Sequence, residues 1–314
     1  MTATEISAKF SNMGFLCVCL VVTMHVHCPW EGGGINQLAV PFFFVMSGYF
    51  LAAHVDEKGW YGAAVRKRAR TLLLPLFAWC MLWLLYAVPI ALLLNHHAGR
   101  PPFSNLLTGW GVLRYAALDL TCTPAMGPLW YVRCLFLFVL VSPLMVALIR
   151  RLGVVALIPV CMVYLAYALY VRAYDVVDVF SYGFSLEGLF YFTIGLYLRM
   201  RNYSLDVSLP TGAVLFVFGL FVYWIACVDF AIPLMIVGLW GVMPTRAFPK
   251  VLAKNTFPIY LIHMFVLLLF GSAKIADPLI AIGVGCMAIV VSLFVAVGLR
   301  KLLPRTASFL FGGR

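Results

Sequence analysis

The chain has 314 residues, of which 64% are hydrophobic and only 11% are charged, and its formal net charge is +11. Soluble domains are about 45–50% apolar and about 25% charged, so this composition excludes an ordinary soluble domain, a disordered chain, collagen, a coiled coil and a small disulfide scaffold. The apolar residues form unbroken runs, which excludes an outer-membrane β-barrel and predicts an all-α polytopic membrane protein.

Ten apolar segments have about the length that a membrane-spanning helix needs, which is about 20 residues. We predict spans at residues 11–29, 36–54, 72–95, 128–149, 153–171, 179–198, 209–227, 230–244, 252–271 and 277–299. The eighth of these is short for a span. The long connection from His96 to Gly127 is predicted to hold a short interfacial helix around 110–118. We therefore expect residues 1–314 to form a single membrane-embedded domain of about ten helices.

The lysines and arginines lie in short clusters between the apolar segments, which indicates membrane orientation and argues against nucleic acid as a partner. A cytoplasmic N-terminus with ten crossings places seventeen of the 22 basic residues in the cytoplasm. Four fall outside, namely Arg100, Arg114, Arg172 and Lys274, and Arg133 falls within a span. This division predicts that both termini are cytoplasmic. No cleavage pattern follows the first segment, which we expect to be a retained signal anchor.

The nine cysteines do not indicate a metal site. Seven lie in predicted spans, where a cysteine acts as a small hydrophobic residue. Cys28, at the outer end of the first segment, and Cys122 fall on the outer side, where they are either free thiols or a disulfide. The sequence has no metal-ligand spacing and no glycine-rich loop for phosphate, so no metal is expected.

Ionisable side chains within spans are costly and mark candidate functional positions. The candidates among them are His25, Arg133, Glu187 and His263. Arg133 and Glu187 have an alternative role, which is to neutralise each other as a buried pair.

His25 is the strongest candidate for a catalytic base. It follows Lys9 by 16 residues, or about 24 Å of helix, which places it near the extracytoplasmic side. An imidazole there can accept a proton from a hydroxyl group. The alternative is a histidine whose ring lies in the headgroup layer, and we assign that role to His27. Ser47 adds a hydroxyl to the second segment, but a serine nucleophile needs a base beside it.

The run AAVRKRARTLLLP places Arg66, Lys67, Arg68 and Arg70 directly before the third span, on the predicted cytoplasmic side. Four cations within five residues suit a polyanionic cytosolic ligand, because arginine makes bidentate hydrogen bonds to phosphate. Two alternatives stay open, a topology signal and contact with anionic lipid headgroups.

Four local patterns resemble the integral-membrane acyltransferase 3 family, whose members O-acylate envelope glycans and similar acceptors in bacteria. The patterns are LVVTMH ending at His25, VPFFFVMSGYFLA at 40–52, RKRARTLLLPLFAW at 66–79 with GPLWYVRCLFLFVLVSPL at 127–144, and NTFPIYLIHMFVL at 255–267. They occur in the family's order in five of the ten segments, so the resemblance extends over nearly the whole chain.

The resemblance implies a ten-span bundle in the bacterial inner membrane. It implies transfer of an acyl group, usually acetyl from acetyl-coenzyme A, to a hydroxyl of an extracytoplasmic glycan or lipid-linked acceptor. The residues expected in catalysis are His25 as the base, Arg133 and His263, and those expected to bind the donor are Arg66, Arg68, Arg70 and Ser47. Arg133 and Ser47 are also candidates for stabilising the negative charge on the reacting carbonyl oxygen.

Two positions depart from the family pattern. Many relatives have an arginine eleven residues before the first-span histidine, where this chain has Gly14. Relatives often have an acidic residue after the arginine of the fourth span, where this chain has Cys134. Lys9 or the 66–70 cluster could supply the missing cation.

These departures keep further functions open. The donor could be bound differently, or the chain could be a member that does not acylate. The polar residues within spans are also compatible with a transporter or flippase of an envelope lipid or polar metabolite, and the departures with a structural partner protein.

Overall fold

The computed structural model describes residues 2–26, 35–93, 120, 126–174, 183–203, 206–225, 228–269, 275 and 277–313. Every regular element within these ranges is a helix, which confirms the predicted all-α fold. Six helical stretches are long and apolar enough to cross a membrane, and they are Thr4–Met24, Ile35–Ala52, Trp60–Tyr86, Gly127–Tyr167, Lys250–Leu269 and Pro278–Leu302. Two shorter apolar helices accompany them, so the chain is a multi-pass membrane protein.

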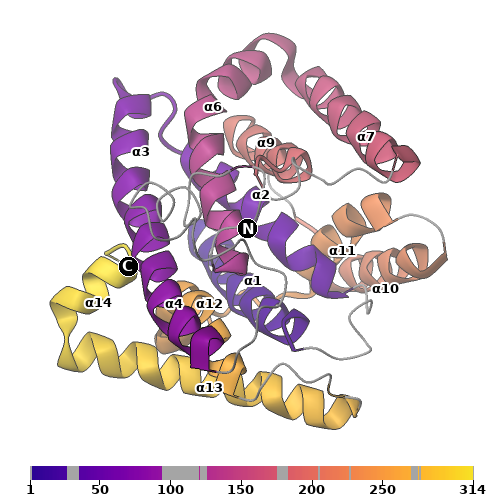
Figure 1. Ribbon diagram of the computed structural model, residues 1–314. Coiled ribbons are helices and arrows are strands. Elements are labelled where there is room, and N and C mark those ends of the chain that lie inside the picture. Colours follow the sequence, from indigo (N-terminus) through magenta and orange to yellow (C-terminus); the bar gives the residue numbers. More distant parts are fainter. Residues whose placement is uncertain are drawn as a thin grey trace. The chain divides into compact units, whose positions relative to one another are not determined.

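Each of the ten predicted segments corresponds to one helix (Figure 1). In chain order these are α1 (Ala3–Met24), α2 (Ala39–Ala52) after the 3₁₀ turn η1 (Ile35–Leu38), α4 (Leu74–Leu93), α6 (Trp130–Leu152), α7 (Leu157–Tyr174), α9 (Leu186–Met200), α10 (Leu209–Ile225), α11 (Val228–Val242), α12 (Lys250–Leu269) and α13 (Pro278–Leu302). The predicted interfacial helix at 110–118, His27, Cys28 and Cys122 lie outside the described residues.

The sequence did not predict the helix α3 (Trp60–Arg68), which extends the third segment toward its N-terminal side. A π-helical turn, η2 (Ala69–Leu73), joins α3 to α4 without a break. None of the residues of α3 is buried, so no apolar periodicity marks this helix in the sequence. Short elements complete the fold, namely η5 (Gly127–Leu129), η6 (Gly153–Ala156) and α14 (Pro304–Leu310).

The chain divides into two units by packing. The first unit comprises residues 1–50 and 198–307, and the second comprises residues 51–197 and 308–314. In the first unit α1 packs against α12 and α13, and α10 packs against α11. In the second unit α3 and η2 pack against α6.

Asn12 ties the middle of α1 to the loop before α12 in the first unit. Its side chain is fully buried, and its amide nitrogen donates hydrogen bonds to the carbonyls of Pro244 at 3.1 Å and Arg246 at 2.9 Å. Its amide oxygen accepts a hydrogen bond from the backbone N–H of Phe248 at 2.8 Å. A buried amide with both ends bonded fixes where the chain enters α12.

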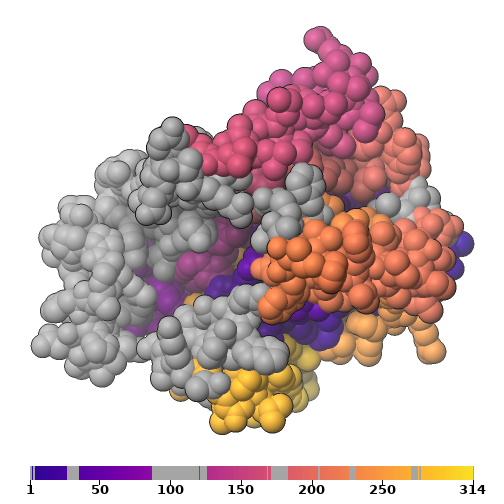
Figure 2. Space-filling model, turned by 90° about the vertical axis from the view of Figure 1, so that its right-hand side faces the viewer, coloured from indigo at the N-terminus to yellow at the C-terminus, as the bar shows by residue number. Residues whose placement is uncertain are grey.

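Glycines allow close approach of α10 and α11 in the first unit. A Cβ built on Gly238 would lie 2.4 Å from the backbone nitrogen of Phe216, and one on Gly212 would lie 2.7 Å from the Cα of Gly241. Figure 2 shows α10 and α11 as one continuous surface in salmon and orange. Large apolar residues of α10 are exposed on the chain's surface, as expected for contact with lipid, and they include Val214, Val217, Phe218, Phe221 and Trp224.

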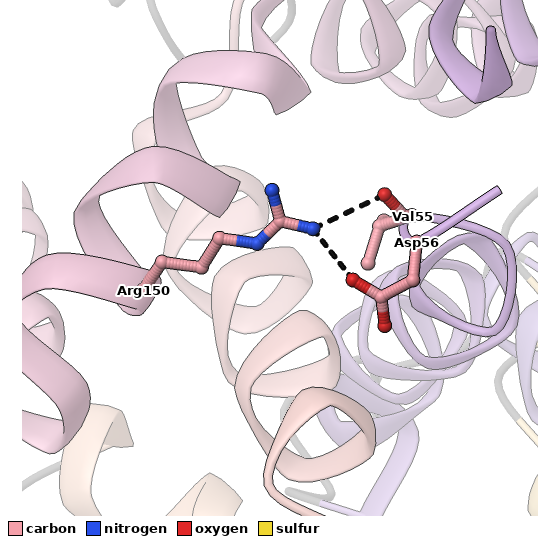
Figure 3. A network of polar contacts seen from close by, with 3 residues as sticks. All are labelled: Val55, Asp56 and Arg150. Carbon is pink, nitrogen blue, oxygen red and sulfur yellow. Dashed lines mark hydrogen bonds and ion pairs between the residues drawn. The ribbon is translucent and has the colours of Figure 1, made fainter. Parts of the chain in front are cut away.

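Arg150 joins the end of α6 to the turn that precedes α3 in the second unit. Figure 3 shows its guanidinium reaching the turn, where one nitrogen donates to the Val55 carbonyl at 3.2 Å and to the Asp56 carboxylate at 2.6 Å. Both charged side chains are more than half exposed, so the pair contributes little to stability. It does show that the α2–α3 turn and the end of α6 lie at the same end of this unit.

Candidate functional site

Two histidines that are far apart in the sequence meet in the first unit. The imidazole of His25 lies at the end of α1, and that of His263 lies on α12. Their ring centroids are 5.2 Å apart, with an angle of 64° between the ring planes. His263 is completely buried, whereas His25 is half-buried. His25 is therefore the more exposed histidine of the pair, and His263 is the more deeply buried one.

The meeting follows from the two helices that carry these residues. The Asn12 hydrogen bonds hold the middle of α1 beside the start of α12 at Lys250. His25 lies 13 residues beyond Asn12 and His263 lies 13 residues beyond Lys250, so each helix rises by about 20 Å at 1.5 Å per residue. Because α1 and α12 pack side by side, equal rises bring the two imidazoles to the same level.

Hydrogen bonds fix the form of both imidazoles. The Nδ1 atom of His25 is 2.8 Å from the carbonyl oxygen of Val21, and the Nδ1 atom of His263 is 2.6 Å from that of Tyr260. A carbonyl oxygen only accepts, so Nδ1 carries the proton and donates it in both contacts. In the neutral ring the lone pair then lies on Nε2. Both side chains thus hold the tautomer in which Nε2 is the basic atom.

Open space adjoins Gly14 on the His25 side of α1. The residue itself is buried, yet a Cβ built on it would meet no atom of the described residues within 4 Å. Eleven residues of helix turn by about 20° beyond three full turns, so Gly14 and His25 lie on the same face of α1, about 16 Å apart along the axis. The position at which relatives have an arginine is therefore open here.

Lys9 does not replace the missing arginine. Its ammonium group is buried, donates a hydrogen bond to the carbonyl of Trp240 at 2.9 Å and lies 5.7 Å from the centre of the Trp240 ring. Sixteen residues of helix place it about 160° around α1 from His25, on the opposite face. Lys9 holds α1 against α11 and is engaged there.

Ser47 is half-buried on α2 in the same unit. The ring of Tyr49 packs 4.9 Å from that of Phe10, so this end of α2 is level with the start of α1. His25 lies 15 residues beyond Phe10, about 22 Å along α1. Ser47 is therefore nearer to the level of Phe10 than to that of the two histidines.

The basic cluster of Arg66, Lys67, Arg68 and Arg70 lies in the second unit, at the junction of α3 with η2. Arg66, Lys67 and Arg70 are exposed, and Arg68 is half-buried. Within the described part of the chain, no carboxylate forms an ion pair with any of the four. Like charges four residues apart repel one another, so the cluster would be stabilised by an anion.

Arg68 links this cluster to α6. The phenol of Tyr131, on the first turn of α6, lies close enough to the Arg68 guanidinium to interact with its charge. Arg133, two residues further along α6, is buried, with 4% of its surface exposed. The basic cluster and the LWYVR pattern are thus neighbours within the second unit.

The residue after Arg133 also has a structural role. The thiol of Cys134 donates a hydrogen bond to the carbonyl of Gly183 at 3.4 Å, which holds the segment before α9 against α6. Glu187 is half-buried in the first turn of that helix. The position that is often acidic in relatives is here a buried packing contact.

His25, His263 and Ser47 thus belong to the first unit, whereas Arg66, Arg68, Arg70 and Arg133 belong to the second. Sequence reasoning identified these residues singly but missed the pairing of the two histidines and the π-helical turn at the cluster. The HMFVL and LVVTMH patterns contain the signal for the pair, since each has one histidine in an otherwise apolar helix. In the part of the chain that the structure describes, no group of three or more His, Cys, Asp or Glu residues could hold a metal ion.

The chain was compared with protein families, curated proteins and solved structures. The family model of acyltransferase 3, described as an acyltransferase domain, matches residues 13–299. No curated protein and no solved structure matched. The matched range includes both histidines, the basic cluster and Arg133 and covers most of the chain, so this membrane protein belongs to the acyltransferase 3 family and is an acyltransferase.

Proposed function

We propose that the protein transfers an acyl group, with acetyl as the expected one, from cytosolic acyl-coenzyme A to a hydroxyl of an extracytoplasmic glycan or lipid-linked envelope acceptor. The observation that carries the proposal is the His25 imidazole, half-buried with its proton held on Nδ1. A base of this form and exposure suits the activation of a hydroxyl group.

The proposed reaction uses His25 as a general base. Its Nε2 accepts the proton of the acceptor hydroxyl while the hydroxyl oxygen attacks the thioester carbonyl. The carbon–sulfur bond then breaks, and the imidazolium returns the proton to the leaving thiolate of coenzyme A. His263 keeps the His25 ring in place from behind. Arg133 is the proposed stabiliser of the negative charge on the carbonyl oxygen.

The donor's phosphates bind the basic cluster in this proposal. Arg66, Arg68 and Arg70 offer guanidinium groups that match phosphate geometry, and no carboxylate among the described residues competes for them. The hydrocarbon core is about 30 Å thick, and the pantetheine arm is long enough to thread much of it. The open space at Gly14, on the His25 face of α1, would admit the arm, and Ser47 would contact it.

We further propose that residues 1–314 act as one domain in the bacterial inner membrane, with both termini in the cytoplasm. The bias of lysine and arginine supports this orientation. The cluster then faces the cytosolic donor, and His25 faces the outer side, where the acceptor is presented. Acyl groups cross the membrane without a free intermediate.

The test is incubation of membranes that contain the protein with acetyl-coenzyme A labelled in the acetyl group. We expect label in an extracytoplasmic product that mild alkali releases, as an O-ester. Membranes with the His25→Ala variant at equal abundance serve as the control. Absence of label in any product, alongside protein-dependent movement of an envelope lipid, would contradict the proposal and favour a flippase.

A further inference from the structure

The C-terminal residues of the second unit pack against the π-helical turn that follows the basic cluster. Gly312 has a left-handed backbone with φ of 65°. A Cβ built on it would lie 2.5 Å from the carbonyl oxygen of Thr71 and 2.9 Å from its Cα. Thr71 is the central residue of η2. Glycine is therefore required at 312 by both the backbone conformation and the contact.

Two contacts anchor this C-terminal segment to α4. The indole Nε1–H of Trp79 donates a hydrogen bond to the carbonyl of Leu310 at 2.9 Å. The ring of Phe311 is fully buried and stacks on that of Trp79, with centroids 6.3 Å apart and 18° between the planes. Trp79 lies about two helical turns beyond Thr71. The segment thus holds both η2 and the helix that follows it.

The π-helical turn decides where the cluster points. The N–H of Leu74 bonds to the carbonyl of Ala69, five residues earlier, so the turn accommodates one extra residue. One residue corresponds to about 100° of helix rotation, so the cations before the turn face a direction that a continuous α-helix would not give them. The Thr71 hydroxyl is buried and has no hydrogen-bond partner among the described residues, so it does not stabilise the turn.

We propose that residues 308–313 are a positioning element for the donor site: they hold η2 in its π-helical form and thereby direct Arg68 and Arg70 toward the donor's phosphates. The inference rests on the proposed function, because it takes the cluster as the phosphate site. It adds that binding of the donor depends on Gly312, Phe311 and Trp79, which do not themselves contact it.

Two neighbouring glycines provide a matched test. Gly313 is also left-handed, with φ of 72°, but among the described residues a Cβ there would meet only the Ser308 hydroxyl, at 4.0 Å. The variants Gly312→Ala and Gly313→Ala therefore share the backbone strain and differ in the contact with Thr71. We expect Gly312→Ala to raise the dissociation constant of coenzyme A and the KM for acetyl-coenzyme A by about fivefold or more, with kcat within about twofold. Gly313→Ala should stay within about twofold of wild type in both.

Binding is measured by calorimetry with coenzyme A and the full-length protein in nanodiscs. Trp79→Phe keeps an aromatic ring beside Phe311 but removes the hydrogen bond to Leu310. If Gly312→Ala does not accumulate in the membrane, this variant tests the positioning role instead. We expect it to raise the dissociation constant by about twofold to tenfold, the equivalent of one hydrogen bond. Equal losses in both glycine variants would overturn the inference, because strain in the segment would then explain them.

The arginine variants separate the inference from the proposed function. Arg68→Gln and Arg70→Gln should each raise the dissociation constant of coenzyme A by about tenfold or more. If they do so while Gly312→Ala and Trp79→Phe bind as wild type does, only the positioning role is overturned. If the arginine variants bind coenzyme A normally, the phosphate site itself is wrong, and the inference fails with it.

Discussion

At the scale of single residues, the exposure of His25 sets its expected role. Because its ring is half-buried and its proton is held on Nδ1, the Nε2 atom can receive a proton from a bound hydroxyl. We expect His25→Ala to lower kcat by about 10²- to 10⁴-fold, the usual contribution of a general base. Donor binding and protein abundance should stay near wild type, as measured by calorimetry with coenzyme A and by immunoblotting.

The control for this prediction is His54→Ala. His54 is also a histidine, but it is exposed, and its Nδ1 lies 2.7 Å from the carboxylate of Glu57, three residues further along. Its loss should leave kcat within about twofold, because the substitution affects a solvated pair. Equal losses in the two variants, or full activity in His25→Ala, would show that the base lies elsewhere. His263 would then be the next residue to replace.

Asn12 affects His25 and His263 indirectly, because its hydrogen bonds to the backbone before α12 align α12 with α1. Asn12→Ala removes the hydrogen bonds to Pro244, Arg246 and Phe248, each with a net contribution of about 0.5–1.5 kcal/mol. We expect a loss of about 2–4 kcal/mol of stability and a parallel loss of activity, since the relative level of α1 and α12 depends on this side chain. Chemical unfolding of the protein in detergent measures the first effect.

Asn36→Ala is the matched control, because the Asn36 side chain makes no hydrogen bond to the described residues and is half-buried. Its effect on stability should be below about 0.5 kcal/mol. If the two variants unfold alike, the Asn12 hydrogen bonds do not fix the entry of the chain into α12.

The sequence identified His25 and His263 because an ionisable side chain within an apolar run is unusual whatever the fold. It did not predict that they meet. That meeting depends on α1 and α12 being neighbours and on the Asn12 contact that aligns them, and neither has a local signature. The sequence offered Lys9 as a substitute cation and could not show that it is engaged elsewhere, because its burial depends on contact with the distant Trp240.

At the scale of elements, long apolar runs predicted the transmembrane helices well, because the bilayer fixes both their length and their polarity. The helix α3 and the turn η2 had no such signal. The residues of α3 are all at least partly exposed, and the contact of η2 with Gly312 comes from the far end of the chain. A contact between residues so far apart in the sequence has no local signature.

The packing of α10 on α11 leads to a prediction at the same scale. A methyl group at Gly238 would lie 2.4 Å from the Phe216 nitrogen, which is backbone and cannot move away alone. Gly238→Ala should therefore lower the free energy of unfolding by about 1–3 kcal/mol or more, as overpacking does. Chemical unfolding of the purified protein in detergent measures it.

Gly14→Ala is the counterpart on α1, since its methyl group would enter open space. We expect this variant to gain about 0.5–1 kcal/mol of stability from its greater helix propensity. Destabilisation of both variants by similar amounts would mean that α1 is as tightly packed at Gly14 as α11 is at Gly238.

At the scale of the whole molecule, the polar contacts sort the basic residues by end within each unit. In the first unit Asn12 holds the loop through Arg246, and the guanidinium of Arg300 donates to the side-chain oxygen of Asn255 at 3.1 Å and to the Lys254 carbonyl at 3.2 Å. These contacts bring Asn12 in the middle of α1, the start of α12 and the end of α13 to the same level of the unit. The predicted topology, in which the basic loops lie on one side of the membrane, also places these three segments together.

In the second unit the Arg150 contact brings the α2–α3 turn and the end of α6 to the same end (Figure 3). The topology proposed above places both in the cytoplasm under the positive-inside rule, because the basic cluster follows one of them and Arg150 and Arg151 end the other. Two crossings separate them in the chain, namely the third and fourth spans. Two crossings return the chain to the side of the membrane from which it started, so the Arg150 contact agrees with the predicted third and fourth spans.

Single cysteines test the proposed membrane topology. Arg151→Cys places a thiol at the exposed end of α6, and Asp229→Cys places one at the start of α11, where the seventh and eighth spans meet. In a background with Cys28 and Cys122 changed to serine, a membrane-impermeant maleimide applied to intact cells should label the cysteine at 229 and spare the one at 151. Lysis should make the latter reactive. Labelling of both from outside would contradict the ten-span arrangement, because its fifth, sixth and seventh spans lie between these sites and three crossings place them on opposite sides of the membrane.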